Sequence, residues 1–218
     1  MIPPAMTEWG DILTNKILTT TVSVILFLLY LGDLFKLMPS MMYSIGRPRG
    51  VASFEHNVSM ARIRNRIAAI CILPFCLIAD RFSLYEPSFL ENIPPQWTSV
   101  ALVGVLTAYL SFRHILHVCI SPKLLSRDNA QAARRNLYSF FILLCFLMIL
   151  SSGAMIFFNA DESTSKIVFY SETALFFLCA IIRTMQFLKS VCSNLRTFLY
   201  LCTLEIVPAS ILVLSALM

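Results

Sequence analysis

Charged residues are scarce in this chain, and their scarcity indicates its class. Only 13% of the 218 residues are Asp, Glu, Lys or Arg, whereas a soluble domain usually contains about 25%. Hydrophobic residues make up 58% of the chain, and its mean hydropathy is +0.77. This composition excludes an ordinary soluble domain and indicates an integral membrane protein.

The sequence also lacks the motifs of several enzyme and cofactor classes. None of its seven cysteines stands in a CxxC or CxxH spacing, and most lie in apolar runs, where cysteine acts as a small hydrophobe. No P-loop, GxGxxG or HExxH motif occurs. We therefore expect no metal, no cofactor and no catalytic residue, and the net charge of +5 requires no nucleic-acid partner.

Long apolar runs are what the chain has in abundance. A transmembrane helix needs roughly 20 apolar residues, and six such runs are separated by short polar stretches. We predict an all-α, polytopic bundle that forms a single membrane domain over residues 1–218, with a bend at Pro74 in the second helix. The six predicted transmembrane helices span residues 17–36, 67–85, 97–120, 137–158, 167–188 and 198–218.

Basic residues gather in alternate loops and predict the orientation of the bundle. Of the 17 Lys and Arg residues, only Lys16, Arg81 and Lys166 fall at one set of helix ends. By the positive-inside rule the other loops are cytoplasmic, so both termini face the exterior or periplasm. These loops are expected to contact the anionic lipid head groups of the bilayer. Their most clustered members are Arg62, Arg64, Arg66, Arg134 and Arg135.

Charges inside the predicted helices are the candidates for function, because an ionisable group in the hydrocarbon core costs at least ~2.5 kcal/mol. Arg183 lies near the end of the fifth predicted helix and Glu205 inside the sixth, each on the order of 10 Å from the same membrane face. We predict that they pair across these two helices. The full predicted polar layer comprises Arg183, Glu205, Asp33, Arg113, His114 and His117.

Two interpretations of this layer stay open. It can be a proton or ion relay or a head-group site, or it can consist of ion pairs that fix helix register, with Arg113 snorkelling to the interface. Pro208 leaves the carbonyl of Leu204 without its helical donor, so Thr203 or a water is expected to bond there. His114 and His117 share a helical face, but a metal or haem would need a further ligand from elsewhere.

A family resemblance is carried by three parts of the chain. They are the segment NLRTFLYLCTLEIVP at residues 194–208, the apolar run with Arg183 before it, and RNLYSFF at residues 135–141. Together they resemble domain-of-unknown-function family 4271, uncharacterised polytopic inner-membrane proteins of Bacteroidota. The resemblance implies a multi-pass protein of the cytoplasmic membrane and implies no activity.

The function expected from these observations is non-enzymatic. We predict an inner-membrane protein of the cell envelope that transports a small solute or supports assembly of a complex with other envelope membrane proteins. The alternative is a membrane enzyme acting on a lipid or isoprenoid phosphate at the cytoplasmic face, with Arg113 binding phosphate and His114 or Glu205 as acid or base. The lack of an aspartate cluster for a metal counts against the enzyme, and the lack of an internal repeat counts against transport.

Overall fold

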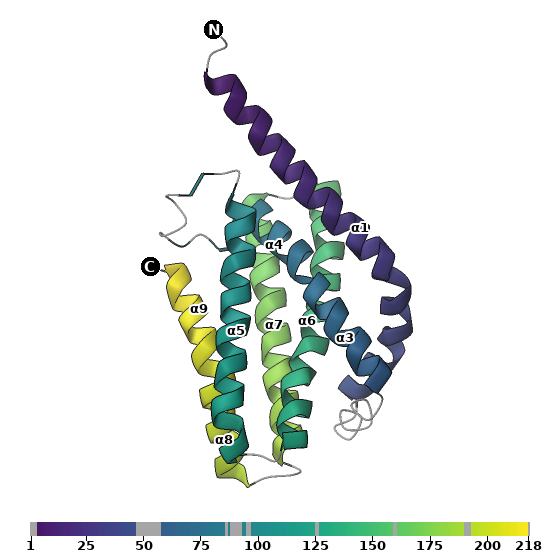
Figure 1. Cartoon of the computed structure of the whole chain (residues 1–218), viewed down its shortest axis with the longest axis vertical. Coiled ribbons are helices and arrows are strands. Elements are labelled where there is room, and N and C mark those ends of the chain that lie inside the picture. The colour runs from purple at the N-terminus through teal and green to yellow at the C-terminus, as the bar shows by residue number, and fades with distance from the viewer. Residues whose placement is uncertain are drawn as a thin grey trace.

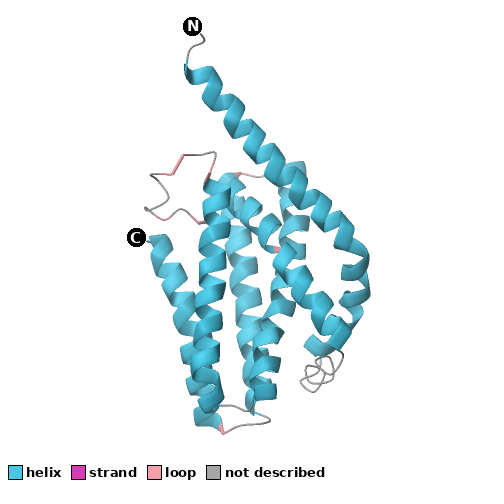
Figure 2. Cartoon of the chain, viewed as in Figure 1, coloured by secondary structure: helices cyan, strands magenta, loops and turns pink. Residues whose placement is uncertain are grey.

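The computed structural model is a bundle of helices that run alternately up and down (Figure 1). The residues that it describes are 4–46, 58–85, 87, 93–94, 97–124, 127–158, 161–189 and 193–217. All regular secondary structure in these residues is helical (Figure 2). The prediction of an all-α fold is thereby confirmed.

The helices follow one another along the chain in passes from one end of the bundle to the other. The end at which α1 begins and α9 ends is called the upper end, as drawn in Figure 1. The described elements are α1 (Pro4–Gly46), α3 (Val58–Ile70), α4 (Ile72–Arg81), α5 (Thr98–Leu124), α6 (Arg127–Phe157), α7 (Glu162–Lys189), α8 (Asn194–Leu201), the π-helical turn η2 (Cys202–Ile206) and α9 (Val207–Leu217). The pairs α3–α4 and α8–α9 each form one interrupted pass.

Five helical segments of the described chain are long and apolar enough to cross a membrane. This finding indicates a multi-pass membrane protein, and the segments correspond to five of the six predicted transmembrane helices. They are Thr20–Pro39, Thr98–Cys119, Asn136–Phe157, Glu162–Lys189 and Asn194–Ser215.

The pass made of α3 and α4 differs from the second predicted transmembrane helix, which was placed at residues 67–85. Its helix begins earlier, at Val58, and is interrupted at Cys71. The interruption lies shortly before Pro74, whose ring nitrogen cannot bond the carbonyl of Ile70, in agreement with the predicted bend. Backbone bonds from Cys71 N to Ile67 O (2.9 Å) and from Phe75 N to Cys71 O (3.2 Å) keep the two helices almost continuous.

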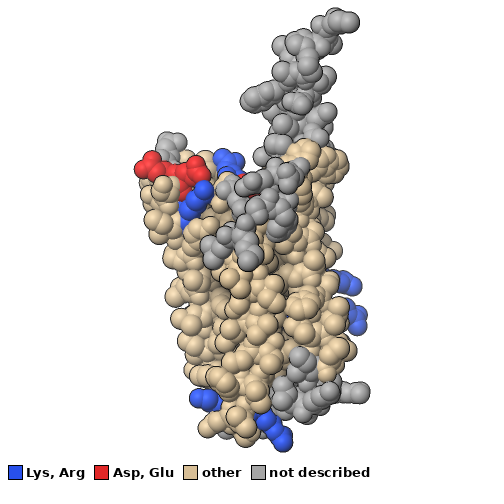
Figure 3. Space-filling view, turned by 90° about the vertical axis from the view of Figure 1, so that its left-hand side faces the viewer, with Lys and Arg blue, Asp and Glu red and all other residues tan. Residues whose placement is uncertain are grey.

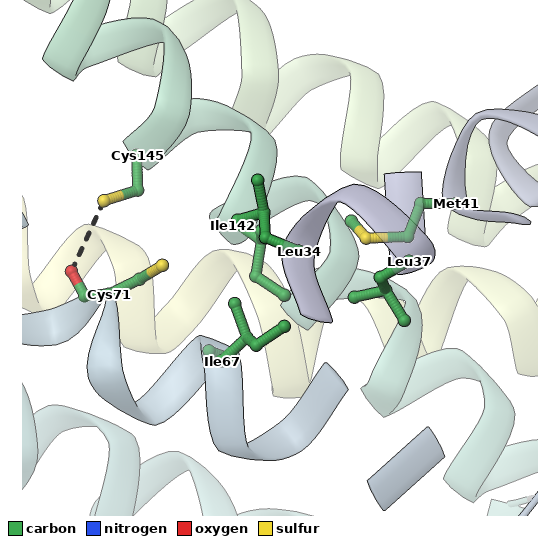
Figure 4. Close-up of a cluster of buried hydrophobic side chains, with 8 residues drawn as sticks. Leu34, Leu37, Met41, Ile67, Cys71, Ile142 and Cys145 are labelled. Carbon is green, nitrogen blue, oxygen red and sulfur yellow. Dashed lines mark hydrogen bonds between the residues drawn. The ribbon is translucent and has the colours of Figure 1, made fainter. Parts of the chain in front are cut away.

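A buried apolar cluster fastens α1 to the rest of the bundle (Figure 4). Leu37 of α1 is fully buried, and Cys145 of α6 donates its thiol hydrogen to the carbonyl oxygen of Cys71 over 3.5 Å. Helices that touch through such side chains gain packing energy even where lipid surrounds them. The cluster consists of Leu34, Leu37, Met41, Ile67, Ala68, Cys71, Ile142 and Cys145.

The outer surface of the bundle is apolar around its middle. Figure 3 shows a face on which uncharged residues cover most of the centre, while charged residues lie toward the two ends and, at mid-height, on the right-hand edge. Large apolar side chains such as Leu29 and Phe157 are more than two-thirds exposed. Lipid chains are the environment in which such a surface is stable.

Candidate functional site

Arg113 and Glu205 form a buried ion pair where α5 meets η2. Nη2 of Arg113 donates to Oε1 of Glu205 over 2.6 Å, and each side chain is only 3% exposed. Counted along its helix, each residue lies about 17 Å from the lower end of its pass. The pair is therefore deep inside the bundle, where a charge-assisted hydrogen bond is strong and an unpaired charge is costly.

The predicted pairing of Arg183 with Glu205 is wrong. Arg183 lies on α7 and donates from Nη1 to Oε1 of Gln186 over 2.8 Å, one turn further along the same helix. Glu205 receives its arginine from α5 instead. The expected snorkelling of Arg113 is also wrong, because its side chain is enclosed by protein. Similar depth on consecutive helices does not determine which neighbour a helix face meets.

His117 and Tyr200 lie beside the ion pair. Nε2 of His117 is 3.9 Å from the Oε1 of Glu205 that Arg113 also contacts, and its Nδ1 is 3.5 Å from the hydroxyl of Tyr200. The two rings meet edge to face, with centroids 5.7 Å apart. Both side chains are buried. We call Arg113, His117, Tyr200 and Glu205 the buried polar cluster.

Helix geometry explains how these four side chains meet. Arg113 and His117 are four residues apart on α5 and so project from the same face. Tyr200 and Glu205 are five residues apart, the spacing that a π-helical turn brings into line. Such a turn covers Cys202–Ile206, and the N–H of Val207 donates to the carbonyl of Cys202.

Pro208 follows the π-helical turn and accounts for its position. Proline has no N–H for the carbonyl of Leu204, as the sequence predicted, so the α-helical pattern cannot continue through this point. The expected bond from Thr203 to Leu204 is not what forms: Oγ1 of Thr203 donates to the carbonyl of Leu199 over 2.7 Å. π-Helical turns occur frequently at functional sites, and this one holds Glu205.

The remaining members of the predicted layer lie outside the cluster. Asp33 is half-buried on α1, Arg183 is half-buried on α7, and His114 is exposed on α5 next to a cavity. Sequence reasoning missed Tyr200. Its spacing of five residues from Glu205 indicates that the two side chains share a helix face only when the π-helical turn is known.

The basic residues predicted in loops belong to helices. Arg62, Arg64 and Arg66 lie in α3, and Arg134 and Arg135 lie in α6, although the side chains of the last two are outside the described part. Arg64 is only 1% exposed, with Nη2 3.2 Å from Oδ1 of Asn65. The loops were predicted too long because a helix can continue past the end of an apolar run.

A cavity of about 420 Å³ lies close to the buried polar cluster, between α3, α4, α5, α6 and α7. Its wall is mostly aromatic and aliphatic, and its polar members include Asn65, Tyr109, His114 and Thr173. Tyr109 is also within electrostatic range of both Arg113 and Glu205. We call this space the lower cavity, and Tyr109 connects it with the cluster.

The cluster has the groups needed to hold and transfer a proton. Glu205 and His117 can both bind one, and Arg113 stabilises the ionised form of Glu205. Nε of Arg113 is buried, and no described residue accepts a hydrogen bond from it. Buried donors nearly always have a partner, so a water or another acceptor is expected at this atom. Among the described residues, no group of three or more His, Cys, Asp or Glu is placed to hold a metal ion.

Comparison with protein-family models, with curated proteins and with solved structures gives no match. The resemblance to an inner-membrane family of Bacteroidota therefore stays a prediction.

Proposed function

We propose that the protein is a non-enzymatic transport component of the inner membrane in the cell envelope, with the buried polar cluster as its proton-exchanging element. The observation that supports this most is the buried Arg113–Glu205 pair with His117 3.9 Å from the same carboxylate oxygen. Ionisable groups inside membrane helices usually mark ion pathways or proton relays, because burying them is costly.

The interrupted passes support the same proposal. Transporter sites commonly lie where helices are discontinuous near the middle of the membrane. In this chain one pass is interrupted at Cys71 and another at Cys202–Ile206, and the second interruption holds Glu205.

The exchange can be written with the residues present. With Glu205 ionised, its Oε1 accepts from Nη2 of Arg113. A proton passed from the imidazolium of His117 to the carboxylate gives a neutral acid and a neutral imidazole, and Arg113 keeps its charge. The bond to Arg113 weakens, and the guanidinium is free to bind another acceptor. The site thus has two proton arrangements of equal net charge, one with an Arg113–Glu205 ion pair and one with a neutral Glu205, which transport can use to bind and release a solute.

We further propose six membrane crossings, with the α3–α4 pass as the second and both termini on the periplasmic side. The support is that Lys189 and Arg196 flank the α7–α8 connection at the lower end (Figure 1), and that the basic residues of α3 lie on a helix that begins toward the same end. A periplasm-active reporter fused after Met218 should be active and a cytoplasm-active one silent. The reverse pattern would overturn the orientation.

The first experiment on function is purification of the intact protein from native membranes, followed by mass spectrometry of bound proteins and small molecules. Transport predicts recovery of the chain together with a small molecule and without a protein in fixed ratio. Recovery of defined proteins in constant stoichiometry would instead indicate an assembly component, and a chemically altered lipid appearing with the purified protein would indicate an enzyme.

The proton-exchange step has its own measurement. Infrared difference spectra on lowering pH should show the band of a buried protonated carboxyl group that disappears in Glu205→Gln. Glu172→Gln is the control, because Glu172 is a half-buried carboxyl on α7 that bonds Ser151 and lies outside the cluster. A spectrum that is the same for wild type and Glu205→Gln would exclude Glu205 as the exchanging group.

A further inference from the structure

We infer that two adjoining cavities of the bundle form a binding site for a single-chain amphiphile with an anionic head group. The inference deepens the proposed transport function by naming a class of solute, and in that respect it depends on that function. The site itself consists of residues outside the buried polar cluster, namely those that form the walls of the cavities and the polar side chains at their upper end.

The second cavity lies above the lower cavity and has a volume of about 610 Å³. We call it the upper cavity. Phe75, Leu106 and Thr173 line both cavities, so the two spaces adjoin. Each volume falls in the range of about 300–1,000 Å³ that is usual for small-molecule sites.

The combined length suits one hydrocarbon chain. Lys166 lines the upper cavity and Ala180 the lower one, and these residues are about 21 Å apart along α7. That length exceeds the roughly 15 Å of one leaflet, which is half of the ~30 Å hydrocarbon core. A single acyl or isoprenoid chain in extended form therefore fits from end to end, in contact with apolar walls.

Polar side chains line both cavities, but the cationic one, Lys166, lies at the upper end of the site, in the first turns of α7. Tyr170 follows it one turn later, and Tyr85 comes from the segment after α4. At the lower end the polar members include Asn65 and His114, and most of the wall between the two ends is aliphatic and aromatic. This distribution matches a molecule with an anionic end at Lys166 and a long apolar part.

Hydrogen bonds hold the polar end in shape. The hydroxyls of Tyr85 and Ser215 are 2.6 Å apart, which connects the segment after α4 to α9. The hydroxyl of Tyr170 donates to the carbonyl of Leu84 over 2.9 Å, which connects the same segment to α7. The mouth of the upper cavity is therefore formed by residues tied to one another from three parts of the chain.

Lys166 determines the charge of the preferred head group. Its Nζ lies 2.9 Å from Oε1 of Glu162, one turn earlier on α7, and the two side chains are 30% and 71% exposed. An exposed pair at this spacing contributes little to stability, so a bound anion can replace Glu162 at small cost. A carboxylate or phosphate head is the complementary ligand.

The experiment measures equilibrium binding of radiolabelled palmitate and 1-hexadecanol to the full-length protein in nanodiscs. The two probes have the same chain length and differ in head-group charge. Wild type should bind palmitate more tightly. Lys166→Gln should weaken palmitate binding about tenfold, as expected for losing one charge-assisted bond, and leave hexadecanol unchanged. Lys189→Gln, at the opposite end of α7, is the matched control and should change neither.

Blocking the junction tests the chain-binding part. Leu106→Trp fills the space shared by both cavities and should weaken binding of both probes at least about tenfold. Ile115→Trp places the same side chain on the exposed side of α5 and should have no effect. Thr173→Phe blocks the junction from α7 and serves as a second test if Leu106→Trp does not fold.

Each outcome has a defined meaning. Equal binding of the two probes, with no effect of Lys166→Gln, would overturn the anionic head-group site. Unchanged binding in both Leu106→Trp and Thr173→Phe would show that the chains bind only the outer surface of the bundle. Palmitate binding that persists in Glu205→Gln while its infrared band is absent in wild type would retain this site and remove the proton-exchange proposal. A Glu205 band in wild type, together with palmitate binding that is insensitive to Lys166→Gln, Leu106→Trp and Thr173→Phe, would remove this site and retain the proton-exchange proposal.

Discussion

Two ion pairs in the described structure have similar lengths and very different surroundings. Arg113 and Glu205 are 2.6 Å apart, each 3% exposed, and lie on helices that are far apart in the sequence. Glu162 and Lys166 are 2.9 Å apart, are 71% and 30% exposed, and lie one turn apart on α7. The comparison shows that distance alone does not indicate how much an ion pair contributes to stability. The contribution depends on whether each charge, once its partner is removed, stays buried or is solvated.

The largest expected effect comes from breaking the buried pair. Arg113→Gln or Glu205→Gln leaves one buried group without its charged partner, which should lower the free energy of unfolding by about 3 to 5 kcal/mol. Replacing both residues by Met should cost less than the two single changes together. Unfolding in mixed detergent micelles, followed by circular dichroism, measures these differences.

The same double-mutant cycle separates the observed pair from the predicted one. Arg183→Gln combined with Glu205→Gln should be additive, because Arg183 bonds Gln186 and not Glu205. Strict additivity for Arg113 and Glu205, or strong coupling for Arg183 and Glu205, would contradict the pairing described here.

An apolar contrast tests whether burial within the protein, rather than depth in the membrane, decides stability. Leu37 and Leu29 lie on the same helix, but Leu37 is 0% exposed and Leu29 is 71% exposed. Leu37→Ala should cost at least about 2 kcal/mol through the lost packing and the cavity left behind. Leu29→Ala should have little effect, because lipid can fill the space. Equal losses of unfolding free energy for the two variants in the micelle assay would contradict the assignment of the cluster around Leu37 as a structural core.

A smaller effect is expected inside the buried polar cluster. Tyr200→Phe removes the hydroxyl that lies 3.5 Å from Nδ1 of His117 and keeps the ring contact. The loss should be about 0.6 kcal/mol, the average for a side-chain hydrogen bond between membrane helices. If His117 and the carboxyl group of Glu205 exchange a proton, removing the hydroxyl that contacts His117 should also change the infrared band of Glu205. A band identical to that of wild type would place Tyr200 outside the exchange.

The smallest effect belongs to the exposed pair. Glu162→Gln removes one partner of Lys166, whose side chain is 30% exposed. The melting temperature of the protein in detergent should therefore stay within experimental scatter, at low and at high ionic strength. A clear loss would show that this pair helps to hold the upper end of α7 in place.

Much of the fold was predictable because it depends on composition and on local patterns. Five of the predicted runs correspond to helical segments long and apolar enough to cross a membrane, and the bend near Pro74 lies within one turn of the interruption at Cys71. The ends of helices were predicted less well. α3 begins at Val58 and α6 at Arg127, in polar sequence, because backbone hydrogen bonding does not require apolar side chains.

The site was predictable in part. Arg113, His117 and Glu205 were identified because a charge or imidazole in an apolar run is unusual and costly. The partner of Glu205 was predicted wrongly, because Arg183 was chosen for its similar depth on the preceding helix, and similar depth does not determine which helix faces meet. Tyr200 carries no charge and was not identified at all.

The sequence by itself determined that this is an all-helical membrane protein, how many long apolar runs it has, and which few ionisable side chains lie deep within them. Those properties depend on transfer free energies and helix periodicity, which are local. Only the tertiary structure decided that Glu205 pairs with Arg113, that a π-helical turn aligns it with Tyr200, and that two cavities adjoin near Leu106. Which face of one helix meets which face of another depends on the packing of the whole bundle, and no single stretch of chain contains that information.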